Sequence, residues 1–141
     1  MSFTLEDARE VLAAQPFNGA VGARLVVFEP GEAVLELEIE ERHRQQYGVV
    51  HGGVYAYLAD NSLTFAVGSV LGANVITAGM TVSYLRAARA GMLRAHAMVE
   101  HHDKRQAACS VRVSSVPPEG GAEKLCAIAQ GTVLVTRQSD R

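Results

Sequence analysis

The chain has 141 residues, of which 48% are hydrophobic and 20% charged, and its net charge at pH 7 is −2. This length and composition predict one globular domain with a single core, and they exclude a disordered or fibrous chain. The balance of 13 Lys and Arg against 15 Asp and Glu disfavours a nucleic-acid-binding protein.

No segment is predicted to enter a membrane. The least polar stretch, residues 52–71, is interrupted by Asp60 and Asn61, and a carboxylate is costly in lipid. The first 15 residues carry three acids and lack an apolar core, so they do not match a secretory signal. Two cysteines, Cys109 and Cys126, lie in apolar runs outside any metal-binding spacing. We therefore expect reduced core thiols and a cytoplasmic protein.

The N-terminal segment, residues 1–18, is predicted to contain a short amphipathic helix. Thr4 and Asp7 have the spacing of a capping box, and apolar residues recur at helical spacing through residues 4–15. Pro16 is expected to end this helix.

The rest of the chain predicts strands around one long helix. Residues 52–71 are apolar on every side, which is typical of a buried helix, and Gly72 is placed to end it. This order predicts an α+β fold in which an antiparallel sheet wraps around the central helix, and its open sheet edges predict an oligomer. The predicted strands are residues 24–28, 33–39, 75–86, 92–101, 107–116 and 125–136.

Asp60 is the only charged residue among residues 52–85. Burying a carboxylate costs several kcal/mol unless it is paired, hydrated or placed at a cleft. Two interpretations follow. Asp60 is either an ion-pair or groove residue without chemistry, or the acid of an active site.

Two glycines, Gly52 and Gly53, stand at the start of this helix. Glycines there leave backbone N–H groups uncovered, so a carbonyl oxygen or an anion can approach the positive end of the helix dipole. Such N–H groups can act as an oxyanion donor. The alternative is that the glycines only make a tight turn, which the preceding His51 caps.

The motif Gln-x-x-Gly-x-x-His-Gly-Gly at residues 45–53, with Asp60 nine residues after the histidine, resembles the hotdog-fold acyl-CoA thioesterases, in particular the phenylacetate-pathway (PaaI-like) group. Residues 76–91 are similar to the family's strand after the central helix. The resemblance covers residues 19–136. It implies a hotdog fold, a single thioesterase domain over residues 1–141 and a short tail at 137–141.

The resemblance also implies a set of catalytic residues. The catalytic carboxylate falls on Asp60, and the donor to the thioester carbonyl falls on the backbone N–H of Gly52. The full predicted set is Asp60, Gly52, Gln45, Thr77, Thr64 and His51.

Three more residues of this set match family positions by side-chain type, and two of them, the threonines, also have a structural interpretation. Gln45 falls where many members have Asn and others Gln, so its amide could orient the carbonyl or a water. Thr77 matches a hydroxyl that positions water in some members, although threonine is also common in strands. Thr64 matches a hydroxyl used in another branch, although it could simply bond back to its own helix.

These few groups suffice for thioester hydrolysis, because the leaving thiol has a pKa of about 8.5 and needs no strong general acid. Asp60 could attack the acyl carbon or activate water, and both roles stay open. Gly52 and Asp60 are separated by about 12 Å along a helix. We therefore predict an active site shared between subunits of a dimer or of a dimer of dimers, a homotetramer.

The predicted substrate is an acyl-CoA, and no metal or redox cofactor is expected. His101, His102 and Asp103 lack the geometry of a metal site, because neighbours on a strand point to opposite faces. Aromatic residues that could line an acyl pocket, or could simply be core, are Tyr47, Tyr55, Tyr57 and Phe65. Cations that could meet the CoA phosphates, or could be solvated, are Arg86, Arg89, Lys104 and Arg105.

Two other functions remain compatible with the sequence. A hotdog protein could bind acyl-CoA without hydrolysing it, because binding needs the pocket but not Asp60. A structural oligomerisation domain is the other alternative, and the uncapped Gly52-Gly53 helix start argues against it.

Overall fold

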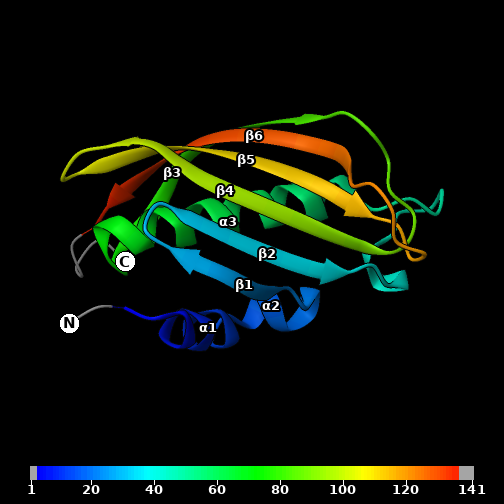
Figure 1. Ribbon diagram of the computed structural model, residues 1–141, viewed down its shortest axis with the longest axis horizontal. Helices are drawn as coiled ribbons and strands as arrows, with labels where there is room; N and C mark the ends of the chain where they lie inside the picture. Colours follow the sequence, from blue (N-terminus) through cyan, green and yellow to red (C-terminus); the bar gives the residue numbers. More distant parts are fainter. Residues whose placement is uncertain (1–2, 137–141) are drawn as a thin grey trace.

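The computed structural model describes residues 3–136, which form a curved six-stranded antiparallel sheet around one long helix (Figure 1). The predicted tail, 137–141, lies outside the described residues. The strand order is β1-β2-β4-β5-β6-β3. The elements are α1 Leu5–Ala13, α2 Pro16–Val21, β1 Arg24–Glu29, β2 Glu32–Glu38, a 3-10 turn at Glu41–His43, α3 Gly52–Leu71, β3 Val75–Tyr84, β4 Met92–His102, β5 Gln106–Val116 and β6 Lys124–Val135. The predicted α+β plan is confirmed.

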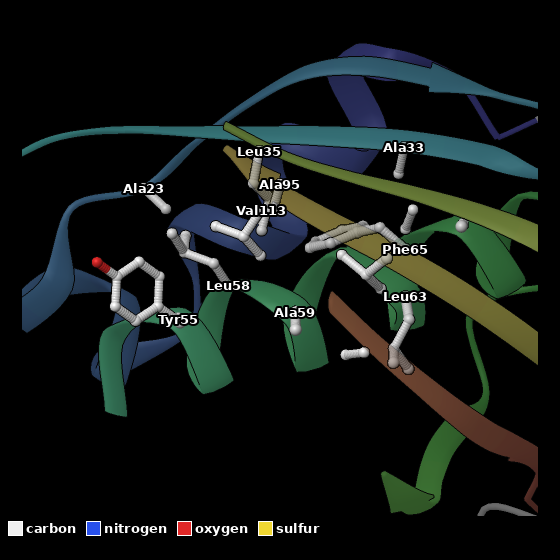
Figure 2. Close-up of a cluster of buried hydrophobic side chains, with 14 of the residues drawn as sticks. Ala23, Ala33, Leu35, Tyr55, Leu58, Ala59, Leu63, Phe65, Ala95 and Val113 are labelled. Carbon is white, nitrogen blue, oxygen red and sulfur yellow. The ribbon is translucent and has the colours of Figure 1, made fainter. Parts of the chain in front are cut away.

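The core lies between α3 and the concave face of the sheet. Leu58 and Leu63 of α3 are fully buried. Leu58 points at side chains of β2, β4 and β5, as Figure 2 shows, and Leu63 lies against Gly131 of β6. Burying one such leucine contributes about 1.5–3 kcal/mol, so this contact fixes the helix on the sheet. The fully buried α3 residues are Leu58, Ala59, Ser62, Leu63, Ala66 and Val67.

The N-terminal segment differs from its prediction. The capping box is confirmed: the Asp7 N–H donates to Thr4 Oγ1 over 3.1 Å, and the Thr4 N–H donates to the Asp7 carboxylate over 2.8 Å. The predicted stop at Pro16 is wrong, because α1 already ends at Ala13 and Pro16 starts a second helix, α2. Proline fits a helix start because its missing N–H would have no partner there.

The end of α3 at Gly72 and the two cysteines match expectation. Gly31 and Gly72 have φ of 78° and 94°, in the left-handed region that glycine tolerates at the β1–β2 turn and after α3. Cys109 and Cys126 are buried and free, as predicted. Burial raises the pKa of the Cys109 thiol to about 12. Within residues 3–136, no helix combines the length and apolar character that crossing a membrane requires.

Candidate active site

Asp60 lies on a partly exposed face of α3, beside the edge strand β3. Six α3 residues line a pocket of about 530 Å³ along this face, because residues three or four positions apart lie on the same side of a helix. Gln15 and Phe17, at the start of α2, line one side of the pocket, and Thr77 and Met80 of β3 line the other side. The six residues of the floor are Gly53, Ala56, Tyr57, Asp60, Asn61 and Thr64.

An irregularity in β3 shapes the side of the pocket that this strand lines. The pairing of β3 with β6 shifts between Thr77 and Gly79, so one extra residue, Ala78, enters the strand. A bulge of this kind re-aims side chains, and it lets Thr77 and Met80, three positions apart, line the same pocket. Opposite Met80 stands Gly131, where a Cβ would lie 2.9 Å from Leu63 Cδ2. Glycine there lets α3 approach the sheet beside the pocket.

The Asp60 carboxylate is held by one hydroxyl. Thr77 Oγ1 donates to Asp60 Oδ1 over 2.7 Å. Thr64 Oγ1 donates to the Asp60 backbone carbonyl over 2.7 Å and lies 3.1 Å from Thr77 Oγ1. Thr64 therefore bonds back to its own helix and also contacts the hydroxyl that holds Asp60.

No cation among residues 3–136 lies within 4.0 Å of the Asp60 carboxylate. The ion-pair interpretation of Asp60 thus finds no partner in the described part of the chain. Asp60 is instead a half-buried carboxylate that faces a pocket, where it can accept a proton or attack a carbonyl carbon.

The start of α3 has one covered and one uncovered N–H group. The Gly53 N–H donates to His51 Nδ1 over 2.8 Å, so the predicted cap is present. The Gly52 N–H has no hydrogen-bond partner within the described residues. Tyr84 lies beside it, since a Cβ on Gly52 would be 3.4 Å from Tyr84 Cε1. The uncovered Gly52 N–H can donate to a carbonyl oxygen.

Gln45 belongs to the loop before α3 and not to the lining of the Asp60 pocket. Its side-chain oxygen accepts from the Tyr47 N–H, and its backbone N–H donates to the Val49 carbonyl over 2.8 Å. Within one chain, Gln45 and Gly52 lie near the start of α3, while Asp60, Thr64 and Thr77 meet two turns further along. The structure thus divides the predicted catalytic set into two groups.

The four predicted cations lie in two pairs at opposite ends of β4. Arg86 and Arg89 line one hollow of about 250 Å³ together with Lys124, which is not among the predicted cations. Lys104 and Arg105 lie at the turn between β4 and β5, at the other end of these strands. Eleven residues of strand separate the two ends by roughly 33 Å.

Of the four predicted aromatic residues, only Tyr57 lines the Asp60 pocket. Tyr55 and Phe65 are buried in the core (Figure 2), and Tyr47 is exposed. Burial raises the pKa of Tyr57, and the nearby Asp60 charge raises it too, although a hydrogen bond from Asn61 opposes the shift. Tyr57 is therefore protonated at neutral pH.

Gln15, Phe17, Asn61 and Met80 line the pocket but were not predicted as site residues. The first two lie at the start of α2, a helix that the predicted stop at Pro16 leaves out. The available signal was Pro16 followed by Gly22, since proline starts and glycine ends many helices. Within residues 3–136, no group of three or more His, Cys, Asp or Glu side chains is arranged to hold a metal ion.

Comparison with known proteins identifies the family. Residues 47–122, more than half of the chain, match the family model described as the Thioesterase superfamily. The chain belongs to this superfamily. Membership agrees with the predicted reaction class, a thioester hydrolase.

Relatives and solved structures agree with this family. A 1,4-dihydroxy-2-naphthoyl-CoA hydrolase of Listeria monocytogenes is 28% identical over 84% of this chain and 94% of its own. Human acyl-coenzyme A thioesterase 13 is 32% identical over 64% of this chain and 69% of its own. The structure of the E. coli PaaI protein matches with a TM-score of 0.80 at 21% identity, over 94% of this chain and 92% of its own. The predicted hotdog fold is confirmed.

Proposed function

We propose that this thioester hydrolase is an acyl-CoA thioesterase that uses Asp60 as its catalytic carboxylate and needs no metal or redox cofactor. The observation that carries the proposal is the Asp60 carboxylate, which faces a pocket, has no cation within 4.0 Å in residues 3–136 and is held by Thr77. The names of the Listeria and human relatives, both CoA thioester hydrolases, support a CoA substrate.

The chemistry needs few groups. Either Asp60 attacks the acyl carbon to give an anhydride that water then cleaves, or it removes a proton from a water that attacks the same carbon. In both routes the C–S bond breaks and CoA leaves as a thiolate, whose thiol has a pKa of about 8.5. Because Thr77 occupies one carboxylate oxygen, the other oxygen is available to the water or substrate.

The second group in the mechanism is the Gly52 N–H, which we propose polarises the thioester carbonyl. It is uncovered, and it lies at the positive end of the α3 dipole. Eight residues of helix separate it from Asp60 by about 12 Å, which is too far for both to contact one carbonyl group. We therefore assign Gly52 from one subunit and Asp60 from a two-fold-related subunit to the same site, in a dimer or a dimer of dimers.

For the coenzyme phosphates we propose Arg86 and Arg89, whose side chains line one hollow with Lys124. Three cations at one hollow suit a phosphate group. Lys104 and Arg105 lie roughly 33 Å away along β4 and β5. We assign them to the coenzyme only where a neighbouring subunit brings them to its site.

A substrate panel tests the activity. The purified protein is incubated with phenylacetyl-, butyryl- and octanoyl-CoA, and free CoA is measured with a thiol-detecting reagent. We expect release of CoA from at least one of them that scales with enzyme concentration. Absence of CoA release from all three, with a folded protein, would contradict the proposal.

A complementation experiment tests the shared site. Asp60→Asn and Gly52→Pro are prepared separately, the second because proline lacks the donor N–H and is accepted at helix starts. Circular dichroism checks that both fold. After denaturation and refolding of equal amounts together, about half of the dimers are mixed, and each holds one intact site, so about a quarter of wild-type activity returns. If the mixture stays inactive although mass spectrometry shows mixed dimers, Asp60 and Gly52 do not act across subunits.

A further inference from the structure

Phe17 is an exposed aromatic side chain at the rim of the Asp60 pocket. It is 63% exposed, yet its ring lies 5.1 Å from the Tyr57 ring in an edge-to-face arrangement. Phe17 and Tyr57 line both the Asp60 pocket and an adjoining hollow of about 300 Å³. Leaving a large apolar side chain in water is unfavourable, and apolar rims with few polar groups are typical of ligand pockets.

A buried asparagine fixes the helix that carries Phe17. Asn18, the next residue, is 8% exposed, and its side-chain amide donates to the Ala23 carbonyl over 3.0 Å. Its oxygen accepts from the Ala23 N–H over 3.1 Å and from the Tyr57 hydroxyl over 2.7 Å. These bonds tie α2 to α3 on one side of Phe17.

Asn61, the neighbour of Asp60, ties the other side. Its side-chain amide donates to Gln15 Oε1 and to the Tyr57 hydroxyl, both over 2.9 Å. Gln15 and Asn18 thus flank Phe17 in sequence, and both are bonded to α3. The polar groups of this network satisfy one another, so they hold the wall of the pocket and leave the Phe17 ring facing its interior and rim.

The position of Asp60 determines which part of the substrate lies next to Phe17 and Tyr57. Under the proposed function the acyl carbon must reach the Asp60 carboxylate, which brings the adjoining atoms of the acyl group into the same pocket. The apolar surfaces there are Phe17 and Tyr57 on one side and Ala56 and Met80 on the other. Helix α2 lies outside residues 47–122, the part of the chain that matches the family model. The side of the pocket that contains Phe17 therefore does not belong to the matched region.

We propose that Phe17 is a specificity-determining residue that contacts the acyl group, and that Tyr57 and Asn61 are positioning residues that hold it over the pocket. This inference rests on the proposed acyl-CoA substrate. The acyl group it favours is apolar and extends past the thioester, as phenylacetyl and octanoyl do. An acetyl group offers only a methyl group to the ring, so we expect it to gain little from Phe17.

Binding to an inactive protein measures the contribution of the acyl group directly. In the Asp60→Asn background, calorimetry gives the Kd of free CoA, of phenylacetyl-CoA and of octanoyl-CoA. The ratio of the CoA Kd to the smaller acyl-CoA Kd is the acyl preference. We expect Phe17→Ala to lower this preference about tenfold, the value of burying most of one phenyl ring, and to leave the Kd of free CoA unchanged.

Two further variants separate contact from positioning. Phe3→Ala is the matched control, because Phe3 is also an exposed N-terminal aromatic but packs on Phe28, 5.8 Å away, and does not line the pocket. It should leave the acyl preference unchanged. Tyr57→Phe keeps the ring and removes the hydroxyl that bonds Asn18 and Asn61, and it should lower the preference by about twofold to fivefold.

The inference is overturned if Phe17→Ala leaves the acyl preference unchanged, or if Phe3→Ala lowers it equally. It is also overturned if Phe17→Ala changes only the oligomeric mass, because Phe17 is then a subunit contact. Continued hydrolysis by Asp60→Asn would instead contradict the catalytic role of Asp60. The Phe17 effect is then measured in the wild-type background as the ratio of kcat/KM for phenylacetyl-CoA to that for acetyl-CoA.

Discussion

The two faces of α3 differ in what they contact and in what they contain. The face toward the sheet is formed by apolar residues and one serine, all shielded from solvent, and Leu58 and Leu63 pack there on the strands. The opposite face contains Tyr57, Asp60 and Asn61 and is open to a pocket of about 530 Å³. The first face holds the fold together, and the second contains Asp60, which we propose as the catalytic carboxylate.

This difference shows why the average polarity of a helix hides its function. Over its 20 residues α3 is apolar on every side, so its pattern alone gives no preferred face. The open face is marked by a few polar side chains, and among them Asp60 is the only charged one. Substitutions on the two faces should therefore have separable effects on rate and on stability.

The largest effect is expected from Asp60→Asn on the open face. The change keeps the shape and removes the charge and basicity, so kcat should fall by about 10²-fold or more. The melting temperature should stay close to that of the wild type, because the carboxylate has no salt bridge within residues 3–136. Steady-state kinetics and thermal unfolding are measured on the same preparation. Near-normal turnover, or a large loss of stability with little loss of rate, would contradict the prediction that the open face of α3 determines rate and not stability.

Leu58→Ala on the packed face should show the opposite pattern. Leu58 is completely buried, and truncating it should lower the free energy of unfolding by about 2–5 kcal/mol. The value of kcat per folded molecule should stay near that of the wild type. Denaturant titration at one fixed protein concentration gives the stability, because subunit association also contributes to it. A fall in kcat comparable to that of Asp60→Asn would mean that packing and chemistry are not separable along α3.

The smallest expected effect is on the reactivity of the two buried thiols, Cys109 of β5 and Cys126 of β6. Burial raises the pKa of Cys109 to about 12, and the thiolate is the reactive form, so at pH 8 Cys109 of the folded protein should not react with a disulfide-exchange reagent. Cys126 should not react either, because its side chain is fully buried and out of reach of the reagent. Unfolding should expose two reactive thiols per chain. The raised pKa also means that stability falls as the pH increases from about 9 toward 12, because only the unfolded chain loses this proton there. Fast labelling of the native protein at pH 8 would contradict the closed packing around β5.

Most of the architecture could be predicted because its signals are local. The isolation of Asp60, the His51 cap and the length of α3 all follow from residue type and spacing, and all are found in the structure. Two features that carry a local signal were still not predicted. Helix α2 has Pro16 at its start and Gly22 at its end, but the interpretation of Pro16 as a stop hid this signal, and the strand between Arg86 and Lys104 already places them at opposite ends. The bulge at Ala78 has no local signal, because it depends on the pairing of β3 with β6.

The distance of about 12 Å between Gly52 and Asp60 also has a genetic meaning under the shared-site proposal. A cell that expresses wild-type chain and Asp60→Asn chain in equal amounts should keep half of its activity, because each mixed dimer retains one working site. A chain that carries both Asp60→Asn and Gly52→Pro should inactivate both sites of every mixed dimer, which leaves about a quarter of the activity. The single change then lowers activity only in proportion to its dose, whereas the double change, one codon further, is dominant-negative.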